Sequence, residues 1–323
     1  MKATILYVGS VAVRAAATLL AVSLLVFAAL HLVPGGFEKL YLGSSGNEEA
    51  YAALRELLGL DRPLTEQYLS WVAGLAHGDF GDSLLSARPI AEQFSVRIPA
   101  TVELALIASF LSIPIGTALG IAAWVANLRG RASGLGRLAG ALSASIPDFV
   151  IAAVLVFGAS LVGWRIAGTS YIPIGDDPVG SVAHMLLPAA SLSFFATGIV
   201  ARTARDAVLA IRTEPFMTMA VARGEPVRQI IRRHILRNIA NPVVTVSAVN
   251  VGYLLGGAVI IERIFAIPGV GDYAVNAVGT RDYPVVMATV MLGAAAFVVA
   301  NALADLAGGI IDPRIGARRQ VSR

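Results

Sequence analysis

Several uninterrupted apolar runs of about 20 residues constrain this chain most, because a helix needs that length to cross the hydrocarbon core of a membrane. Hydrophobic residues make up 56% of the 323 positions and charged residues only 14%. A soluble domain of this size carries roughly 25% charged residues. The runs lack the two-residue alternation of barrel strands, which leaves helices as the spanning structure. The sequence therefore predicts an all-α, polytopic membrane protein.

Six runs are long enough to count as membrane spans, and each is rich in small residues that let membrane helices pack closely. Their approximate bounds are residues 15–33, 101–126, 138–161, 185–200, 239–261 and 284–310, of which the fourth is the shortest. Lys2 and Arg14 precede the first run, as basic residues would in a signal peptide, but no convincing small-residue cleavage site follows. We therefore expect an uncleaved first span.

The distribution of arginine and lysine predicts the orientation, because cytoplasmic loops carry the excess of positive charge. If the N-terminus is inside, most of the 25 basic residues fall on the cytoplasmic side. These are Lys2, Arg14, Arg129, Arg131, Arg137, Arg202, Arg205, Arg212, Arg223, Arg228, Arg232, Arg233, Arg237, Arg314, Arg318, Arg319 and Arg323. The acids on that side are Asp206, Glu214, Glu225 and Asp312. We therefore expect both termini in the cytoplasm.

Residues 35–97, between the first two runs, form the one sizeable polar segment outside the membrane and are called the insertion. We predict a helix over residues 48–58 and another that starts near Pro63, since proline suits a first helical position. The turn-rich stretch 78–83 comes next. The insertion would serve either as a compact cap over the outer mouth or as a docking surface for an extracytoplasmic protein, and the sequence leaves both readings open.

The chain lacks the motifs of several chemistries. Lys2 and Lys39 are the only lysines and neither follows a glycine-rich loop, so the chain has no phosphate-binding loop and would not hydrolyse ATP alone. The histidines His31, His77, His184 and His234 are scattered and there is no cysteine, so no metal-ligand spacing appears. The net charge of +4 is explained by membrane topology, because no aromatic-studded basic domain accompanies it. We expect neither an enzyme nor a nucleic-acid partner.

Ionisable residues inside membrane spans are candidates for function, because burying a charge is costly. Glu103, Asp148 and Asp305 are the candidates here. Glu103 lies near the start of its span, where it would face the outer water, and Asp148 follows Pro147, which would loosen the helix. We favour a packing or near-interface role for each over a functional one. No partner at helical spacing supports a proton relay.

Residues 214–238, called the elbow, are a cluster of charge between the fourth and fifth runs. Residues 215–222 predict a short helix that Gly224 ends, and Pro226 suits the start of a second helix. Along that second helix one face is expected to hold Val227, Ile230, Ile231, His234, Ile235 and Asn238, and the other Arg228, Arg232, Arg233 and Arg237. Such a pair would make a docking lever for a soluble partner. The alternative is a basic interfacial helix that holds lipid headgroups.

The elbow resembles the EAA coupling loop of ABC importer permeases, and most resembles that of the dipeptide, oligopeptide and nickel permease family. The residues that carry this resemblance are 216–224, Phe-Met-Thr-Met-Ala-Val-Ala-Arg-Gly, followed by 233–238, Arg-His-Ile-Leu-Arg-Asn. Further stretches match the same family in order at 22–27, 31–35, 58–64, 67–68, 78–83, 97–104, 186–189, 262–265, 268–271, 281–286 and 312–314. Thr218, Val221, Glu225 and Pro226 depart from the family's usual run, whereas Ala220, Ala222 and Gly224 remain.

The resemblance implies a type I ABC importer permease fold, with about six transmembrane helices and an extracytoplasmic insertion after the first. The implied partners are a second homologous permease, two cytoplasmic ATPase subunits and an extracytoplasmic solute-binding protein, assembled in the lipid bilayer of the bacterial cytoplasmic (inner) membrane. ATP and magnesium would bind to the ATPase subunits, so no cofactor, catalytic or metal-binding residue is expected on this chain. The residues expected to couple to the ATPase are Phe216, Thr218, Ala220, Ala222, Arg223, Gly224, Glu225, Arg233, His234, Arg237 and Asn238.

The family also implies the cargo, which would be di- or oligopeptides. Nickel or a nickel chelate is the alternative within the same family, although no histidine or carboxylate cluster argues for a site on this chain. An ion-coupled secondary transporter, which would work without an ATPase, is the alternative outside the family.

Overall fold

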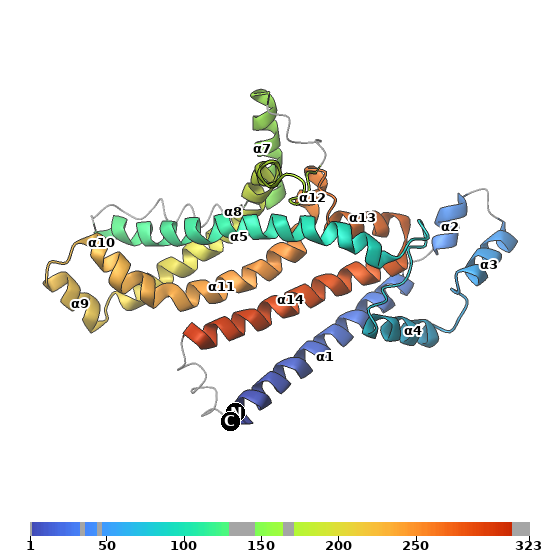
Figure 1. Ribbon diagram of the computed structural model, residues 1–323, viewed down its shortest axis with the longest axis horizontal. Coiled ribbons are helices and arrows are strands. Elements are labelled where there is room, and N and C mark those ends of the chain that lie inside the picture. Colours follow the sequence, from blue (N-terminus) through green and yellow to red (C-terminus); the bar gives the residue numbers. More distant parts are fainter. Residues whose placement is uncertain (1, 33–35, 44–46, 129–145, 164–170, 312–323) are drawn as a thin grey trace. The chain divides into compact units, whose positions relative to one another are not determined.

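The computed structural model describes residues 2–32, 36–43, 47–128, 146–163 and 171–311, and for residues 2–8, 10, 257 and 304–311 it describes the backbone alone (Figure 1). The described residues are almost entirely helical, and their one β-type pairing is an isolated bridge between Asp82 and Pro89. The helices are α1 (Lys2–Leu32), α2 (Phe37–Leu42), α3 (Glu48–Leu57), α4 (Leu64–Ala76), α5 (Ile90–Leu128), α7 (Asp148–Leu161), α8 (Pro178–Ile211), α9 (Pro215–Ala222), α10 (Val227–Ile230), the π-helical η2 (Ile231–Ile235), α11 (Leu236–Gly257), α12 (Val259–Ile264), α13 (Val270–Thr280) and α14 (Tyr283–Ile311).

Within the described residues, five helical segments are long and apolar enough to cross a membrane: Val11–Leu32, Ile90–Ala126, Pro178–Ile211, Val227–Gly256 and Tyr283–Leu303. They correspond to five of the six predicted runs. The remaining run, 138–161, is represented by the shorter apolar helix α7, and its residues 138–145 lie outside the described part of the chain.

The fourth span is not the shortest, because α8 is 34 residues long. At its start the Asp177 carboxylate accepts hydrogen bonds from the backbone N–H groups of Val179 and Gly180, and Pro178 occupies the first turn. At its end the helix continues past Arg202. Ala204 and Val208 are buried there, although the neighbouring arginines lower the hydropathy of this stretch of sequence. The apolar run that predicted the fourth span, residues 185–200, therefore covers only the middle of α8.

The chain divides into two compact units, the first made of Met1–Thr101 and Ile267–Ala296. Its core packs Ile90 and Phe94 of α5 against Ala277 of α13 and Val285 of α14. The predicted helices of the insertion are present, and α3 starts after Asn47, whose side chain accepts a hydrogen bond from the N–H of Ala50. Pro63 occupies the N-cap position, one residue before α4 begins at Leu64, so it is not the first helical residue.

A buried carboxylate ties the turn-rich stretch of the insertion to the start of α14. Asp282 is 3% exposed and accepts a hydrogen bond of 2.6 Å from the hydroxyl of Ser83. It also accepts bonds of 3.0 and 3.3 Å from the backbone N–H groups of Leu84 and Leu85. Charge-assisted bonds of this kind are about twice as strong as neutral ones. Asp282 is therefore the main polar anchor of this stretch.

The second unit comprises Val102–Ala266 and Phe297–Arg323. In it α5 and α8 approach so closely that a Cβ atom on Gly120 would lie 2.6 Å from the Cβ of Ala204, and one on Gly116 would lie 2.7 Å from that of Val200. Only glycine fits at these two positions, as at other close crossings of membrane helices. The predicted fifth span, 239–261, is interrupted, since α11 ends at Gly257 and α12 begins at Val259.

Candidate functional site

The elbow begins with a tight turn that leads from α8 into the short helix α9. The backbone N–H of Glu214 donates to the carbonyl of Ile211, and Pro215 then fills the first turn of α9, where a missing N–H costs no hydrogen bond. The chain thus leaves a membrane-length helix and starts a separate eight-residue helix within a few residues, as the sequence predicts.

One face of α9 is anchored in the hydrophobic core of the second unit. Met217 and Ala220 are each 2% exposed and pack in one cluster with Trp124 of α5 and Val208 of α8. The other face is open: Phe216, Met219 and Val221 are exposed, and so are Thr218, Ala222 and Arg223. Since apolar side chains occur all round this short helix, burying one side of it leaves apolar side chains on the other.

Gly224 ends α9 in the left-handed region, with a φ of +69°, as the sequence predicts. Its N–H donates to the carbonyl of Val221, and the N–H of Glu225 donates to that of Ala220. A Cβ atom on Gly224 would meet nothing within 4 Å. Glycine is therefore needed here for its backbone conformation and not for space.

Glu225 and His234 close the elbow across the turn. The Nε2 atom of His234 lies 3.2 Å from a carboxylate oxygen of Glu225, and both side chains are partly buried. The imidazole ring also lies beside the ring of Phe216, with a centroid separation of 6.1 Å. The structure thus brings together three of the predicted coupling residues that are separated in the chain.

The predicted second helix of the elbow is not a separate element. Pro226 precedes it, and α10, η2 and α11 succeed one another without a break, so residues 227–256 form a single helical segment, called the lever. Its π-helical turn, Ile231–Ile235, adds a residue to the winding and rotates the residues after it about the helix axis. Ile239 is therefore buried, whereas Asn238, predicted on the apolar face, is exposed. Val227 is also exposed, which corrects the same prediction at the other end.

The remaining predicted coupling residues lie along the surface of the lever. Arg233, Arg237 and Asn238 are exposed, and the side-chain amide of Asn238 donates to the carbonyl of His234. Ala220, also among the predicted coupling residues, is 2% exposed and packs in the core of the second unit. Met219 and Val221 are also exposed on α9, and the prediction did not include them. The helical spacing of Phe216 and Met219 is the sequence signal that places Met219 beside Phe216.

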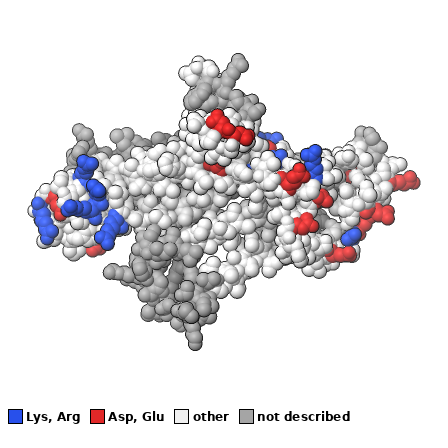
Figure 2. Space-filling model, in the orientation of Figure 1, with Lys and Arg blue, Asp and Glu red and all other residues white. Residues whose placement is uncertain are grey.

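Basic side chains gather near this surface. In Figure 2 blue atoms lie over the region of α9 and α10. The exposed arginines of this part of the chain are Arg212, Arg223, Arg228, Arg232, Arg233 and Arg237. The region thus combines exposed apolar side chains with a cluster of positive charge. Such a surface suits a protein partner with an acidic rim.

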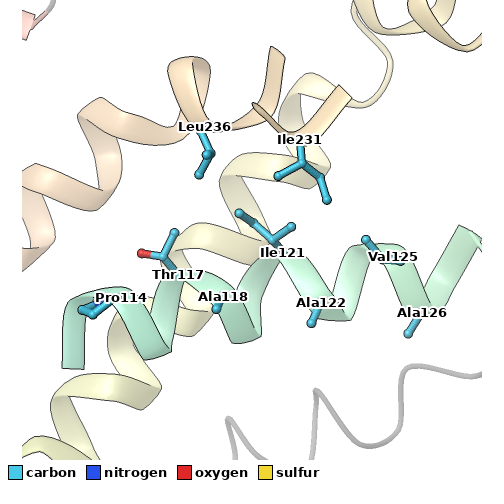
Figure 3. Close-up of a pocket in the computed structure, with 9 residues that line it drawn as sticks. All are labelled: Pro114, Thr117, Ala118, Ile121, Ala122, Val125, Ala126, Ile231 and Leu236. Atoms are coloured by element: carbon cyan, nitrogen blue, oxygen red, sulfur yellow. The ribbon is translucent and has the colours of Figure 1, made fainter. Parts of the chain in front are cut away.

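An apolar groove of about 750 Å³ separates the lever from α5. Figure 3 shows Ile121 of α5 pointing toward Ile231 and Leu236 of the lever, with Thr117 and Val125 farther along the same wall. Ile231 and Leu236 belong to the lever and the other lining residues belong to α5. The groove therefore lies where the elbow end of the lever faces a membrane-length helix.

The ionisable candidates inside the predicted spans lie differently from expectation. Glu103 does not face water: it is 7% exposed and accepts hydrogen bonds from the hydroxyls of Tyr171 and Ser181. Burial and the bond to Glu103 raise the pKa of Tyr171. Asp148 is the first residue of α7 and Pro147 precedes the helix, so this proline does not loosen a helix interior. The side chain of Asp305 lies outside the described residues.

Comparisons with known proteins match nearly the whole chain. The family model described as "Binding-protein-dependent transport system inner membrane component" matches residues 112–317, and the N-terminal model of the same membrane component matches residues 7–105. A putative peptide transport system permease of Brucella suis is 35% identical over 305 residues, covering 94% of this chain and 96% of the relative. A glutathione transport system permease of Salmonella typhimurium is 34% identical over 301 residues, covering 92% and 94%.

Among solved structures, the inward-facing MetNI methionine ABC transporter is similar, with a TM-score of 0.50 and 19% identity over 69% of this chain and 94% of that one. This likeness supports the permease fold. Because both family models and the relatives cover almost the full length, the chain belongs to the family of binding-protein-dependent transport system inner membrane components, and it is a permease subunit of such an importer.

Proposed function

We propose that the chain is a permease for di- or oligopeptides in the bacterial inner membrane, driven by cytoplasmic ATPase subunits that bind at the elbow. One observation carries the proposal. The helix α9 buries Met217 and Ala220 in the core and presents Phe216, Met219 and Val221 to solvent. A partner that binds to the exposed face would move α9, and α9 is packed directly against α5 and α8.

The path from this surface to the membrane is short. The ATPase subunits would displace α9 when they bind ATP, and the turn at Gly224, braced by Glu225 and His234, would pass the displacement into the lever. The lever would then change the groove that Ile231 and Leu236 share with α5. The available free energy is the differential affinity of the partners for the two states.

The assembly would also require a second, homologous permease and an extracytoplasmic solute-binding protein, with both termini in the cytoplasm. The relatives named as peptide and glutathione permeases favour peptides as the cargo. Nickel is the competing cargo within the family. Among the described residues no group of three or more His, Asp and Glu side chains could hold a metal ion.

Single-cysteine crosslinking tests the coupling surface directly, because the chain has no cysteine of its own. In the complete importer, Met219→Cys and Ala222→Cys should crosslink to an ATPase subunit, with a yield that changes on addition of ATP. The matched control is Ala220→Cys, which is buried and should stay unlinked. Absence of ATPase crosslinks at both exposed positions would refute the proposal.

Labelling with a membrane-impermeant thiol reagent tests the orientation. In right-side-out vesicles Leu57→Cys, at an 81% exposed position in the insertion, should react, whereas Met219→Cys should react only after the membrane is opened.

Uptake measured with the importer reconstituted in vesicles distinguishes the possible cargoes. Labelled dipeptide, glutathione and nickel are compared with and without ATP, and uptake that is driven by an ion gradient alone would favour a secondary transporter.

A further inference from the structure

The first unit contains an open pocket of about 610 Å³ that lies on the insertion and has no part in the coupling described above. Its walls come from the end of α1, the segment 56–62, α4, the stretch 79–82 and the start of α14. All of these belong to the same compact unit. The pocket is therefore defined without reference to the second unit.

Buried or partly buried aromatic rings line this pocket and are called its floor. Phe27 and His31 of α1, Trp71 of α4 and Tyr283 of α14 line it. The ring of Phe27 lies 4.2 Å from that of His31 and 5.3 Å from that of Tyr68, and the rings of His31 and Tyr283 are 6.0 Å apart. A 2.8 Å hydrogen bond between the hydroxyls of Ser23 and Tyr68 ties α4 to α1. The floor is thus a connected set of rings.

The pocket is also lined by exposed carboxylates, which are called its rim. These are Glu56, Asp61, Asp79 and Asp82. Asp79 accepts a hydrogen bond from the backbone N–H of Gly81, whereas the side chains of Asp61 and Asp82 have no partner among the described residues.

Arg62 is the one arginine or lysine among the described residues that line the pocket. Its Nη1 atom lies 3.8 Å from a carboxylate oxygen of Glu66. The pocket is therefore negative at its rim and aromatic at its floor.

An aromatic floor with a carboxylate rim favours an organic cation, because the ring faces and the carboxylates attract positive charge together. We propose that this pocket receives a lysine or arginine side chain of the solute-binding protein when that protein docks on the insertion. This inference rests on the proposed function, which supplies the binding protein as a partner. Within the described residues no carboxylate–histidine group fits a metal ion, so an organic cation is preferred to an inorganic one.

The surroundings favour a protein over a small free peptide as the source of the cation. Exposed acids continue beyond the pocket at Glu48 and Glu49 of α3 and at Glu66 of α4. In Figure 2 red atoms are spread over the region of α2, α3 and α4. An acidic field of this breadth is complementary to a basic protein surface and would steer its approach.

The test measures docking of the binding protein on the complete importer in lipid nanodiscs, as a function of NaCl concentration. The double variant Asp61→Asn/Asp82→Asn should weaken docking about ten-fold at low salt and flatten its salt dependence. The matched control, Glu92→Gln/Asp176→Asn, removes the same charge from exposed positions outside the pocket and outside this acidic field, and it should change the affinity less than about two-fold. Equal losses in both variants, or no loss in the first, would overturn the proposal.

Two further arms separate the alternatives. Trp71→Leu should weaken docking, and Trp71→Phe, which keeps an aromatic face, should restore most of it. Trilysine is the probe for a free peptide: if it bound to the importer without the binding protein and the aspartate variants abolished that binding, the binding-protein assignment would be wrong. The Met219→Cys crosslink to the ATPase should persist in every pocket variant. If Met219→Cys gave no crosslink to the ATPase in a chain whose pocket is unchanged, the proposed function would be contradicted and the pocket proposal would not be tested by that result.

Discussion

The elbow and the helices α3 and α4 of the insertion both lie outside the predicted spans, but they are anchored differently. The ends of the insertion are packed through buried apolar side chains, Phe37, Ile90 and Phe94. The elbow is anchored by buried apolar side chains, Met217 and Ala220 of α9 and Ile230 and Ile235 of the lever. In the insertion α3 and α4 bury no residue completely, and polar contacts such as those of Asp282 and Tyr68 fix the segments around them. Apolar packing resists displacement in every direction, whereas hydrogen bonds resist it only along their own geometry.

The two regions also carry opposite charge. The exposed surface near α9 is arginine-rich, and the insertion carries more acids than bases. Each region therefore selects a different protein surface, which agrees with the two proposed partners. Four variants test whether this contrast in anchoring and charge holds.

Ala220→Asp should have the largest effect, because it places a carboxylate at a site that is 2% exposed among apolar side chains. The uncompensated buried charge costs several kcal/mol. We expect little folded protein in the membrane, measured by monodispersity in detergent and by thermal unfolding. Ala222→Asp, on the exposed side of the same helix, is the control and should fold normally. Normal folding of both would contradict the core anchoring of the elbow.

Asp282→Ala should have the next largest effect, since it leaves the Ser83 hydroxyl and the N–H groups of Leu84 and Leu85 without their acceptor. We expect a loss of about 3 kcal/mol and faster protease cleavage within residues 78–88. Asp79→Ala, at an exposed position in the same stretch, serves for comparison. Cleavage at the wild-type rate in Asp282→Ala would show that apolar packing holds the insertion as well.

Gly224→Val should cost about 1–2 kcal/mol at the turn, because a β-branched residue resists a φ of +69°. Since the coupling path passes through this turn, we expect uptake to be abolished and ATPase association to weaken. Gly224→Asn should retain more activity, because asparagine tolerates the left-handed region. Gly256→Ala, where no atom lies within 4 Å of the new Cβ and φ is not positive, should behave as wild type. Normal uptake in Gly224→Val would refute the role of the turn.

Glu225→Gln should have the smallest effect, since it keeps the shape of the side chain and removes only the charge that faces His234. A loss of about 1 kcal/mol or less is expected in stability, together with more ATP hydrolysed per peptide transported. The exchange Glu225→His/His234→Glu should recover part of the coupling. An unchanged ratio of hydrolysis to transport would mean that this contact does not brace the elbow.

The sequence predicted most of the elements and the elbow because their signals are local. Apolar runs marked the spans, Pro215 and Gly224 marked the ends of α9, and the arginines marked the charged surface. The order of family motifs identified the permease, and that identification is confirmed by the family models and the relatives.

Tertiary structure alone decided which face of each element is buried. Nothing local distinguishes Ala220 from Ala222, and only the packing of α9 against Trp124 and Val208 turns the first inward. The π-helical turn likewise places Ile239 on the buried face, where the sequence pattern predicted Asn238. Glu103 and Asp282 accept hydrogen bonds from residues far away in sequence. Helical periodicity arises from the backbone of one segment and can be read locally. Burial arises from contacts between segments that are distant in the chain, and no local pattern in the sequence reveals those contacts.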